Sequence, residues 1–296
     1  MHLGVSSVIQ VNDIVGRKSY DCDVFFRVID VLGDTVILHG EDIRLIADAP
    51  IADLQVISQD EKQQHQQKSN QRINESNHLL AQDRERIRQK KEYEASNGYR
   101  QDPDFFHIPG RVLHIDGDRN YLEKCLVLYR KLQVPVFGVH CHEKEMPYRV
   151  GQLIDQYRPD ILVATGHDAY SKTKGHTHDI GAYRHSLEFA QTVMEARKKV
   201  SSLDQLVIFA GACQSHFESL IQAGANFASS PSRVNIHALD PVYIVSKISF
   251  TPFMDRINVW DVLRNTLTGK KGLGGIETKG VLRVGAPYNA ETSNKN

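Results

Sequence analysis

The chain has 296 residues, enough for one large domain or two smaller ones with cores of their own. Lys and Arg number 36, as do Asp and Glu, so bulk charge gives no reason to expect a nucleic-acid or anionic-membrane partner. No apolar run approaches the roughly 20 residues of a membrane span, and we expect no secretory signal because the first residues lack a basic start followed by an apolar run.

The cysteines favour a reduced compartment. The four are Cys22, Cys125, Cys141 and Cys213, which show neither C-x-x-C spacing nor the density of a disulfide framework. Because disulfide frameworks mark oxidising compartments, a cytosol-like setting is expected.

Residues 1–55 have the pattern of a small β-domain. Short apolar runs occur at residues 5–11, 22–32 and 35–39, and a Gly-Asp pair between the last two is a hairpin signal. So many strands in so few residues predict an SH3-like β-barrel. It holds no cluster of catalytic residue types, so we expect it to serve docking or regulation, or to cap the main domain.

Residues 56–104 are rich in Gln, Asn, Lys, Arg and Glu. Ile73, Leu80 and Ile87 recur every seven residues, which gives a stripe one residue wide. A coiled-coil seam needs two apolar positions per heptad. The segment is therefore predicted to be a solvated helical linker.

Residues 105–290 alternate between apolar strands and helices, and residues 291–296 are predicted to be a disordered tail. Strands are expected at residues 111–116, 134–141, 160–167, 205–213 and 242–248, with helices at 119–132, 183–200 and 216–224 and a helical stretch that ends at 157. Strands rich in Val, Ile and Leu that alternate with helices predict an α/β fold, with a mostly parallel sheet covered by helices on both faces.

Chemically capable side chains follow four of these strands. The strand ends read Asp116-Gly117-Asp118, His140-Cys141-His142-Glu143, Gly166-His167-Asp168 and Gly211-Ala212-Cys213-Gln214. In an open parallel sheet, ligands bind beyond the carboxyl ends of the strands. A functional site is therefore expected at this edge.

His167 and Cys213 are the leading candidates for catalysis. A cysteine nucleophile needs a nearby base to form its thiolate, and neighbouring parallel strands can bring two such groups together. A buried core cysteine and a capping or loop histidine remain the alternatives for the two residues.

Residues 161–167 (ILVATGH) and 206–215 (LVIFAGACQS) carry a resemblance to a known family. An apolar strand that ends in His, followed by one that ends in Ala-Cys, resembles the caspase-like cysteine peptidases, which include clostripain, gingipain, legumain and separase. In that family Gly follows the histidine, whereas here Gly166 precedes His167 and Asp168 follows it.

Segments spread over the whole chain, among them GRKSYDCDVFFRV, VFGVHCHEKEMP and KGLGGIETKG, resemble more specifically a family of sporulation-specific proteases of spore-forming Firmicutes. The resemblance implies a cysteine endopeptidase of the mother-cell cytoplasm, associated with the forming spore coat. It would cleave coat and coat-assembly proteins after Arg or other basic residues. On the motif match, His167 and Cys213 would form the dyad, with no cofactor and no metal.

Such an enzyme needs an oxyanion hole and a specificity pocket. We expect the backbone N–H groups of Gly166 and Cys213 to hold the oxyanion. A bound guanidinium needs a carboxylate partner. Asp116 is the leading candidate for that carboxylate, and Asp168 and Asp240 are the others, although a helix cap or a turn is the alternative for each.

His140 and His142 are further candidates for substrate contact, and they also raise a metal-site alternative. They share one strand face, and Cys141, His167, His176, His178 and His185 could join them around a catalytic zinc. No HExxH motif supports this. A non-catalytic spore-coat scaffold is the other alternative.

The linker also suggests self-cleavage. Its exposed basic residues are Arg84, Arg86, Arg88, Lys90, Lys91 and Arg100. If the enzyme cuts after Arg, cleavage there would separate the small β-domain from the catalytic domain.

Overall fold

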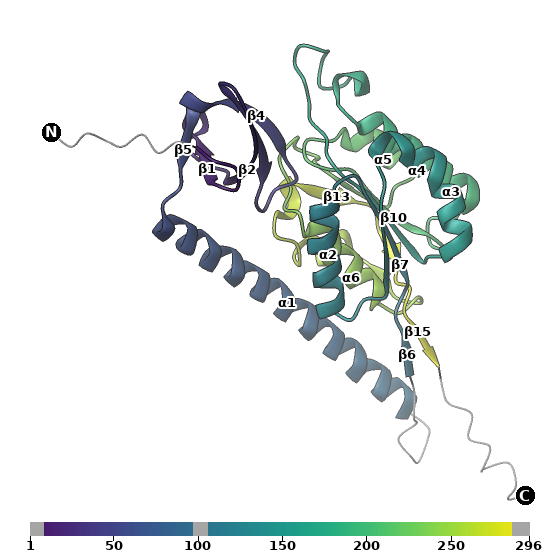
Figure 1. The fold of residues 1–296 in the computed structure, drawn as a ribbon. Coiled ribbons are helices and arrows are strands. Elements are labelled where there is room, and N and C mark those ends of the chain that lie inside the picture. The colour runs from purple at the N-terminus through teal and green to yellow at the C-terminus, as the bar shows by residue number, and fades with distance from the viewer. Residues whose placement is uncertain (1–8, 97–105, 286–296) are drawn as a thin grey trace, which may run out of the picture.

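The structure is a computed structural model that describes residues 9–96 and 106–285. Its N-terminal part is a five-stranded antiparallel sheet in the order β4-β3-β2-β1-β5 (Figure 1). The strands are β1 (Ile14–Arg17), β2 (Phe26–Leu32), β3 (Thr35–Gly40), β4 (Ile46–Pro50) and β5 (Leu54–Val56). The predicted hairpin is confirmed, because Leu32 pairs with Thr35 across a two-residue turn in which Gly33 has φ +62°.

The strand expected at residues 5–11 lies mainly outside the described residues, and residues 9–11 hold none. A separate small core fills the N-terminal sheet and includes Val15, Val28, Val36 and Leu38.

The segment predicted as a solvated linker holds helix α1 (Gln59–Ser96), which runs beside α6 (Asp240–Ser249) (Figure 1). Leu80 is 2% exposed, so the apolar stripe is packed rather than solvated. Asp83 adds ion pairs to Lys247 Nζ at 2.6 Å and Arg264 at 2.5 Å. A stripe one residue wide is therefore enough to dock the helix when the ion pairs of the buried Asp83 support it.

The central sheet has six strands in the order β13-β11-β10-β9-β7-β8. The strands are β7 (Val112–Asp116), β8 (Val136–His140), β9 (Ile161–Thr165), β10 (Val207–Ala210), β11 (Phe227–Ser229) and β13 (Leu273–Gly275). All pairings are parallel except that of β13 with β11, so the predicted mostly parallel sheet is confirmed.

Helices cover both faces of this sheet (Figure 1). Helices α2 (Arg119–Lys131) and α6 pack on one face, in the same core as Val163 and Phe209. Helices α3 (Met146–Tyr157), α4 (Ser186–Lys199) and α5 (Phe217–Gln222) pack on the other, with Leu162 and Ile208. Successive side chains along β9 and β10 point to opposite faces of the sheet and therefore contribute to two separate cores.

The strand predicted at residues 242–248 is wrong, because these residues lie in α6. Nine of the ten α6 residues are buried, and its residues 242–245 (VYIV) form an apolar, mainly β-branched run, which is also the pattern of a buried strand. Pro241 in its first turn is a helix-start signal that could have corrected the prediction. The strand that follows β10 in the sheet is β11, which was not predicted.

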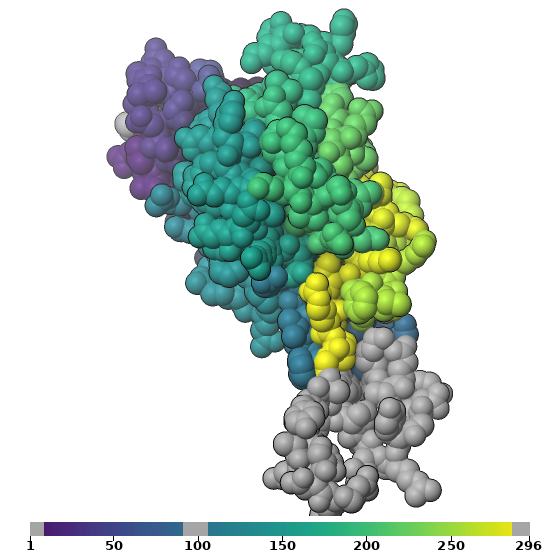
Figure 2. All heavy atoms as spheres, turned by 90° about the vertical axis from the view of Figure 1, so that its right-hand side faces the viewer, coloured from purple at the N-terminus to yellow at the C-terminus, as the bar shows by residue number. Residues whose placement is uncertain are grey.

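Smaller elements complete the described chain. They are β6 (Phe106–Ile108) paired with β15 (Arg283–Gly285), β12 (Arg256–Ile257) paired with β14 (Thr278–Lys279), helix α7 (Val259–Leu263), and 3-10 turns at Lys18–Tyr20, Ile51–Asp53, Glu143–Glu145, Ile180–Ala182 and Gly269–Lys271. Figure 2 shows the N-terminal sheet, in purple, against the main domain. None of the helices described here is both long and apolar enough to cross a membrane.

Candidate active site

The site lies where the strand order of the central sheet reverses. The two neighbours of β7 are β8 on one side and β9 on the other, and β9 pairs with β10. Such a reversal opens a crevice at the carboxyl ends of the strands. Because Ile115 and Ala210 both pair with Ala164, the segments after β7, β9 and β10 emerge side by side.

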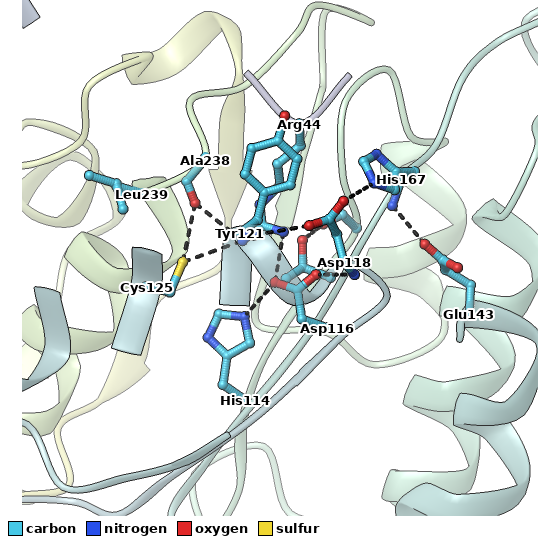
Figure 3. A network of polar contacts seen from close by, with 12 residues as sticks. Arg44, His114, Asp116, Asp118, Tyr121, Cys125, Glu143, His167, Ala238 and Leu239 are labelled. Atoms are coloured by element: carbon cyan, nitrogen blue, oxygen red, sulfur yellow. Dashed lines mark hydrogen bonds and ion pairs between the residues drawn. The ribbon is translucent and has the colours of Figure 1, made fainter. Parts of the chain in front are cut away.

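His167 follows β9 and is fixed at two points. Its Nε2 lies 2.8 Å from Oδ2 of Asp118, and its backbone N–H donates to Oε1 of Glu143 at 2.8 Å (Figure 3). Its Nδ1 is buried and has no hydrogen-bond partner in the described part of the chain. A carboxylate on one imidazole nitrogen orients the ring and leaves the other nitrogen for proton transfer.

Asp118 is the orienting group that the sequence analysis did not identify. Its Oδ1 caps α2 by accepting from the backbone N–H of Tyr121, and its Oδ2 also lies 2.9 Å from Nε2 of His39. Burial raises the pKa of Asp118, but the hydrogen bonds from His167 and His39 outweigh it and hold the pKa well below its usual range. Asp118 is therefore ionised. His39 lies on β3, so the N-terminal sheet takes part in the site.

Glu143 fills the space beside two glycines. A Cβ on Gly117 or Gly166 would lie 2.1 or 2.3 Å from Oε1 of Glu143, which is too close for any side chain. Glu143 itself is 3% exposed. The two glycines therefore let a buried carboxylate reach the backbone of His167.

Cys213 follows β10 and is fully buried. Its Sγ accepts from the backbone N–H of Ile236 at 3.3 Å and lies 3.7 Å from the carbonyl oxygen of the same residue. Burial raises the pKa of the thiol to about 12, so it is neutral at physiological pH. No hydrogen bond joins Cys213 to His167, both of which the structure describes. The two thus lie at neighbouring strand ends without a direct bond.

The backbone before Cys213 requires glycine. Gly211 has φ +103°, and a Cβ there would lie 2.4 Å from Oγ of Ser229. The sharp exit from β10 depends on this residue. The backbone N–H groups of Cys213 and Gly166, expected to hold an oxyanion, donate no hydrogen bond to any described residue. Both are therefore unused donors.

Asp116, the leading candidate for the pocket carboxylate, has a cation. Its Oδ2 lies 2.7 Å from a terminal nitrogen of Arg44, and neither side chain is exposed (Figure 3). The other terminal nitrogen donates to the carbonyl oxygen of Ala238 at 3.2 Å and to Sγ of Cys125 at 3.3 Å. Burial raises the pKa of Asp116, but the Arg44 guanidinium holds it below its usual value.

Asp168 and Asp240 have no such partner. Asp168 accepts from the hydroxyls of Ser186 and Ser215 and from the backbone N–H of His185. Asp240 accepts from the hydroxyl of Thr268 and from three backbone N–H groups. Burial raises the pKa of both carboxyls. Both act as buried caps for neutral donors.

The histidines expected at the second strand end lie apart from this group. His140 ends an edge strand and is exposed, and His142 caps a 3-10 turn with its Nδ1 3.3 Å from the backbone nitrogen of Lys144. His142 contacts the ring of His185, with ring centroids 5.8 Å apart. His176 and His178 are exposed.

A different set of side chains has the spacing of metal ligands. One atom each from His39, Asp118 and His167 lies within 4.8 Å of the other two. Two imidazoles and a carboxylate are ligands that zinc accepts. The distances from Oδ2 of Asp118 to Nε2 of His39 and of His167, 2.9 and 2.8 Å, are those of hydrogen bonds.

The fold and these groups define an α/β protein with a buried cysteine and a carboxylate-held histidine at the switch point of a parallel sheet. The family model described as YabG peptidase U57 matches residues 10–287. The Sporulation-specific protease YabG of Bacillus subtilis (strain 168) is 62% identical over 284 residues, which cover 94% of this chain and 98% of the relative. The chain belongs to the YabG peptidase U57 family and is a peptidase, as the resemblance to sporulation proteases implied.

Proposed function

We propose that this chain is a cysteine endopeptidase in which Cys213 is the nucleophile and His167 the proton carrier. The observation that carries the proposal is the position of His167, held by Asp118 with Nδ1 free, at the end of a strand adjacent to the one that ends at Cys213. The buried-cysteine alternative predicts no such oriented histidine. Membership of a peptidase family counts against the non-catalytic scaffold.

In the proposed reaction, His167 Nδ1 takes the thiol proton and Sγ of Cys213 attacks the scissile carbonyl carbon. The carbonyl oxygen gains negative charge, which the unused N–H groups of Gly166 and Cys213 stabilise. The C–N bond breaks as the imidazolium protonates the leaving amine. Water, deprotonated by the same nitrogen, then hydrolyses the thioester and restores the thiol.

Asp118 would keep the imidazole in one orientation throughout. Because Asp118 is ionised, it also stabilises the imidazolium that forms during the reaction. It acts through His167, so it is a positioning residue.

We propose Asp116 as the carboxylate that recognises a substrate Arg. It is buried, it already binds a guanidinium, and the backbone oxygen of Ala238 completes the donor–acceptor match. Asp168 and Asp240 are less suited, because their oxygens are occupied by neutral donors of the main domain. His140 and His142, which are exposed at the end of β8, can contact other parts of a bound chain.

The finer fold assignments belong to the same proposal. In the central sheet the first strand, β7, lies between the second, β8, and the third, β9, and the fourth, β10, follows β9. This order supports a caspase-like arrangement. Five short antiparallel strands with their own core support an SH3-like N-terminal barrel.

The proposed setting is the mother-cell cytoplasm at the forming spore coat, with coat and coat-assembly proteins as substrates. The support is the name of the B. subtilis relative, a sporulation-specific protease. Incubation of purified coat proteins with the wild type and with Cys213→Ala would test it, and equal fragment patterns would refute it.

Self-cleavage in the linker stays a proposal with a structural condition. Residues from Arg84 to Lys91 lie within helix α1, and the Arg84 guanidinium stacks 3.5 Å from the ring of Phe250. Peptidases generally bind extended segments, so α1 would have to unwind first. Arg100 lies outside the described residues.

A metal-dependent peptidase is the second candidate, supported by the spacing of His39, Asp118 and His167. In that case His167 would be a ligand, and Cys213 would be dispensable. The two candidates therefore predict opposite effects of Cys213→Ala and of a chelator on activity.

A fluorogenic peptide with Arg before the cleaved bond tests both. We expect Cys213→Ala and His167→Ala to abolish hydrolysis. The matched controls Cys141→Ala, after β8, and His178→Ala, at an exposed loop position, should retain it. A thiol alkylator should inhibit and a chelator should not. Loss of activity to the chelator, with Cys213→Ala active, would establish the metal site instead.

A further inference from the structure

The loop between β3 and β4, residues 41–45, enters the main domain beside the candidate site. Three of its backbone carbonyl oxygens accept hydrogen bonds from the main domain. Tyr121 Oη lies 2.5 Å from the carbonyl oxygen of Ile43, and Lys124 Nζ donates to the carbonyl oxygen of Glu41 at 2.7 Å. The backbone N–H of Ala238 donates to the carbonyl oxygen of Asp42 at 2.8 Å. Ile43 also forms an antiparallel bridge with His237. These contacts come from α2 and from the segment before α6, and they bind the loop through its backbone, as peptidases bind substrate chains.

Arg44 is the side chain that the loop delivers. It is fully buried, with Asp116, Ala238 and Cys125 around its guanidinium and the ring of Tyr121 5.1 Å from its Cζ (Figure 3). A carboxylate, a carbonyl oxygen and an aromatic face are the partners that recognise a substrate arginine. The groups around the Arg44 guanidinium are therefore those expected of a pocket for a substrate arginine.

Arg44 also lies beside the segment that contacts the thiol of Cys213. Cys213 is fully buried, and its Sγ contacts both the backbone N–H and the carbonyl oxygen of Ile236. Because Ile43 pairs with His237 in an antiparallel bridge, Arg44 lies opposite Ile236, and its side chain extends from there to Asp116. A substrate arginine at the cleaved position would have its backbone and side chain in these same two places.

The loop differs from a substrate in its backbone shape. The N–H of Leu45 donates to the carbonyl oxygen of Ile43 at 2.7 Å, and Gly40 donates to that of Leu45 at 2.8 Å. These bonds form a tight turn around Arg44, whereas substrates of peptidases are extended. The turn explains how an arginine can occupy the pocket without cleavage after it.

Two features indicate that the contact can open. The Nε of Arg44 is buried without a hydrogen-bond partner among the described residues, which is a cost of the closed state. Behind the loop lies a cavity of about 540 Å³, lined by Asp42, His65 and Ala238 among others. The loop therefore borders open space on the side of Glu41 and Asp42.

We propose that Arg44 is an internal substrate mimic, which occupies the arginine pocket and covers Cys213, so that the wild type hydrolyses peptides only in the fraction of molecules in which residues 41–45 have withdrawn. The inference rests on the proposed function, because it takes Cys213 as the nucleophile and Asp116 as the pocket carboxylate. It assigns the N-terminal sheet a role as inhibitor of its own chain.

The test uses the full-length wild type, Arg44→Gln, and Arg17→Gln as a matched control. Arg17 is in the same sheet and pairs with Asp53, away from the loop. Alkylation by iodoacetamide is followed by mass spectrometry at each cysteine. In Arg44→Gln we expect Cys213 to react at least tenfold faster, while Cys141 is unchanged. Arg17→Gln should match the wild type. Ethylguanidinium should slow the reaction of Cys213 in Arg44→Gln and leave the wild type unaffected.

Tyr121→Phe covers the case in which Arg44→Gln does not fold, because it keeps Arg44 and Asp116 but removes the hydroxyl that holds the loop. We expect it too to accelerate alkylation of Cys213 selectively. An unchanged rate at Cys213 in folded Arg44→Gln would overturn the inference, as would equal acceleration at all four cysteines in Tyr121→Phe.

The outcome is separable from that of the proposed function. If Cys213→Ala still cleaves the Arg peptide, the proposed nucleophile is wrong, whatever the alkylation rates. If Cys213→Ala is inactive but Arg44→Gln neither reacts nor cleaves faster, the nucleophile stands and the substrate-mimic inference fails.

Discussion

Two kinds of buried aspartate lie in the main domain, and their surroundings differ. Asp116 binds a guanidinium supplied by the N-terminal sheet, and its pKa is lowered. Asp168 and Asp240 bind hydroxyls and backbone N–H groups of the main domain, and burial raises their pKa. The cation beside Asp116 outweighs the effect of burial on its pKa, whereas the neutral donors around Asp168 and Asp240 do not. The comparison therefore distinguishes a cation-binding site from two structural caps.

The largest expected effect is that of Asp116→Asn. It leaves the Arg44 guanidinium buried without a counter-charge, which should lower the free energy of unfolding by about 3–5 kcal/mol. Cleavage after Arg should fall about a thousandfold, since about 4 kcal/mol of pocket energy corresponds to that factor. Urea denaturation and kcat/KM measure the two quantities.

Asp116→Asn should also accelerate alkylation of Cys213, because the loop loses its anchor. Reactivity of the thiol and cleavage after Arg would then change in opposite directions. Retention of Arg cleavage by the variant would place the specificity pocket elsewhere.

The next largest effect is expected at Asp118, the carboxylate that binds a histidine rather than an arginine. Asparagine caps a helix as well as aspartate does, so Asp118→Asn should leave α2 intact. It removes the charge that orients His167, and we expect kcat to fall about a hundredfold with little change in KM. His39→Gln, which changes the other imidazole on the same oxygen, is the control. An equal loss of kcat in both variants would contradict a specific role for His167.

Asp240→Asn should have a smaller effect, limited to stability. The amide keeps one acceptor but turns its NH₂ group toward backbone donors, which should cost about 1–2 kcal/mol. Thermal unfolding measures this loss, and kcat/KM on the Arg peptide should not change. A strong loss of Arg cleavage with intact stability would make Asp240 the pocket carboxylate.

The smallest expected effects are on the pH dependence of stability, which should have opposite signs for Asp118 and Asp240. The lowered pKa of Asp118 gives stability that is present above the unfolded value of about 3.9 and lost as the pH falls. The raised pKa of Asp240 gives stability that is present below that value and lost as the pH rises through the folded pKa. Asp118→Asn should therefore destabilise more at pH 7 than at pH 3, and Asp240→Asn more at pH 4 than at pH 7. Denaturant titrations at these values would show the two trends, and parallel trends would contradict the assignment.

The sequence was sufficient to predict the main sheet and the side chains that follow its strands. Strands β7 to β10 are continuous apolar runs bounded by polar loops, so their carboxyl ends could be located within a few residues. The positions of His167, Cys213 and Asp116 at strand ends were predicted in this way. The strand predicted at residues 242–248 failed because the apolar, mainly β-branched run at residues 242–245 is also the pattern of a buried strand.

The contribution of the N-terminal sheet could not be predicted. His39 and Arg44 lie 79 and 72 residues before their partners Asp118 and Asp116. Local patterns carry no information on such pairing, and each residue by itself has the sequence context of an ordinary strand or loop position. Asp118 was visible at a strand end, but its role depends on the direction of the His167 ring.

The most direct test of the central claim is to map covalent capture by a peptide that ends in an arginyl acyloxymethyl ketone. Mass spectrometry of the full-length protein would identify the modified residue. We predict a single adduct on Cys213, formed faster in Arg44→Gln than in the wild type and absent from His167→Ala. An adduct on Cys125 or Cys141 in its place, or hydrolysis of the Arg peptide with no adduct at all, would contradict the account.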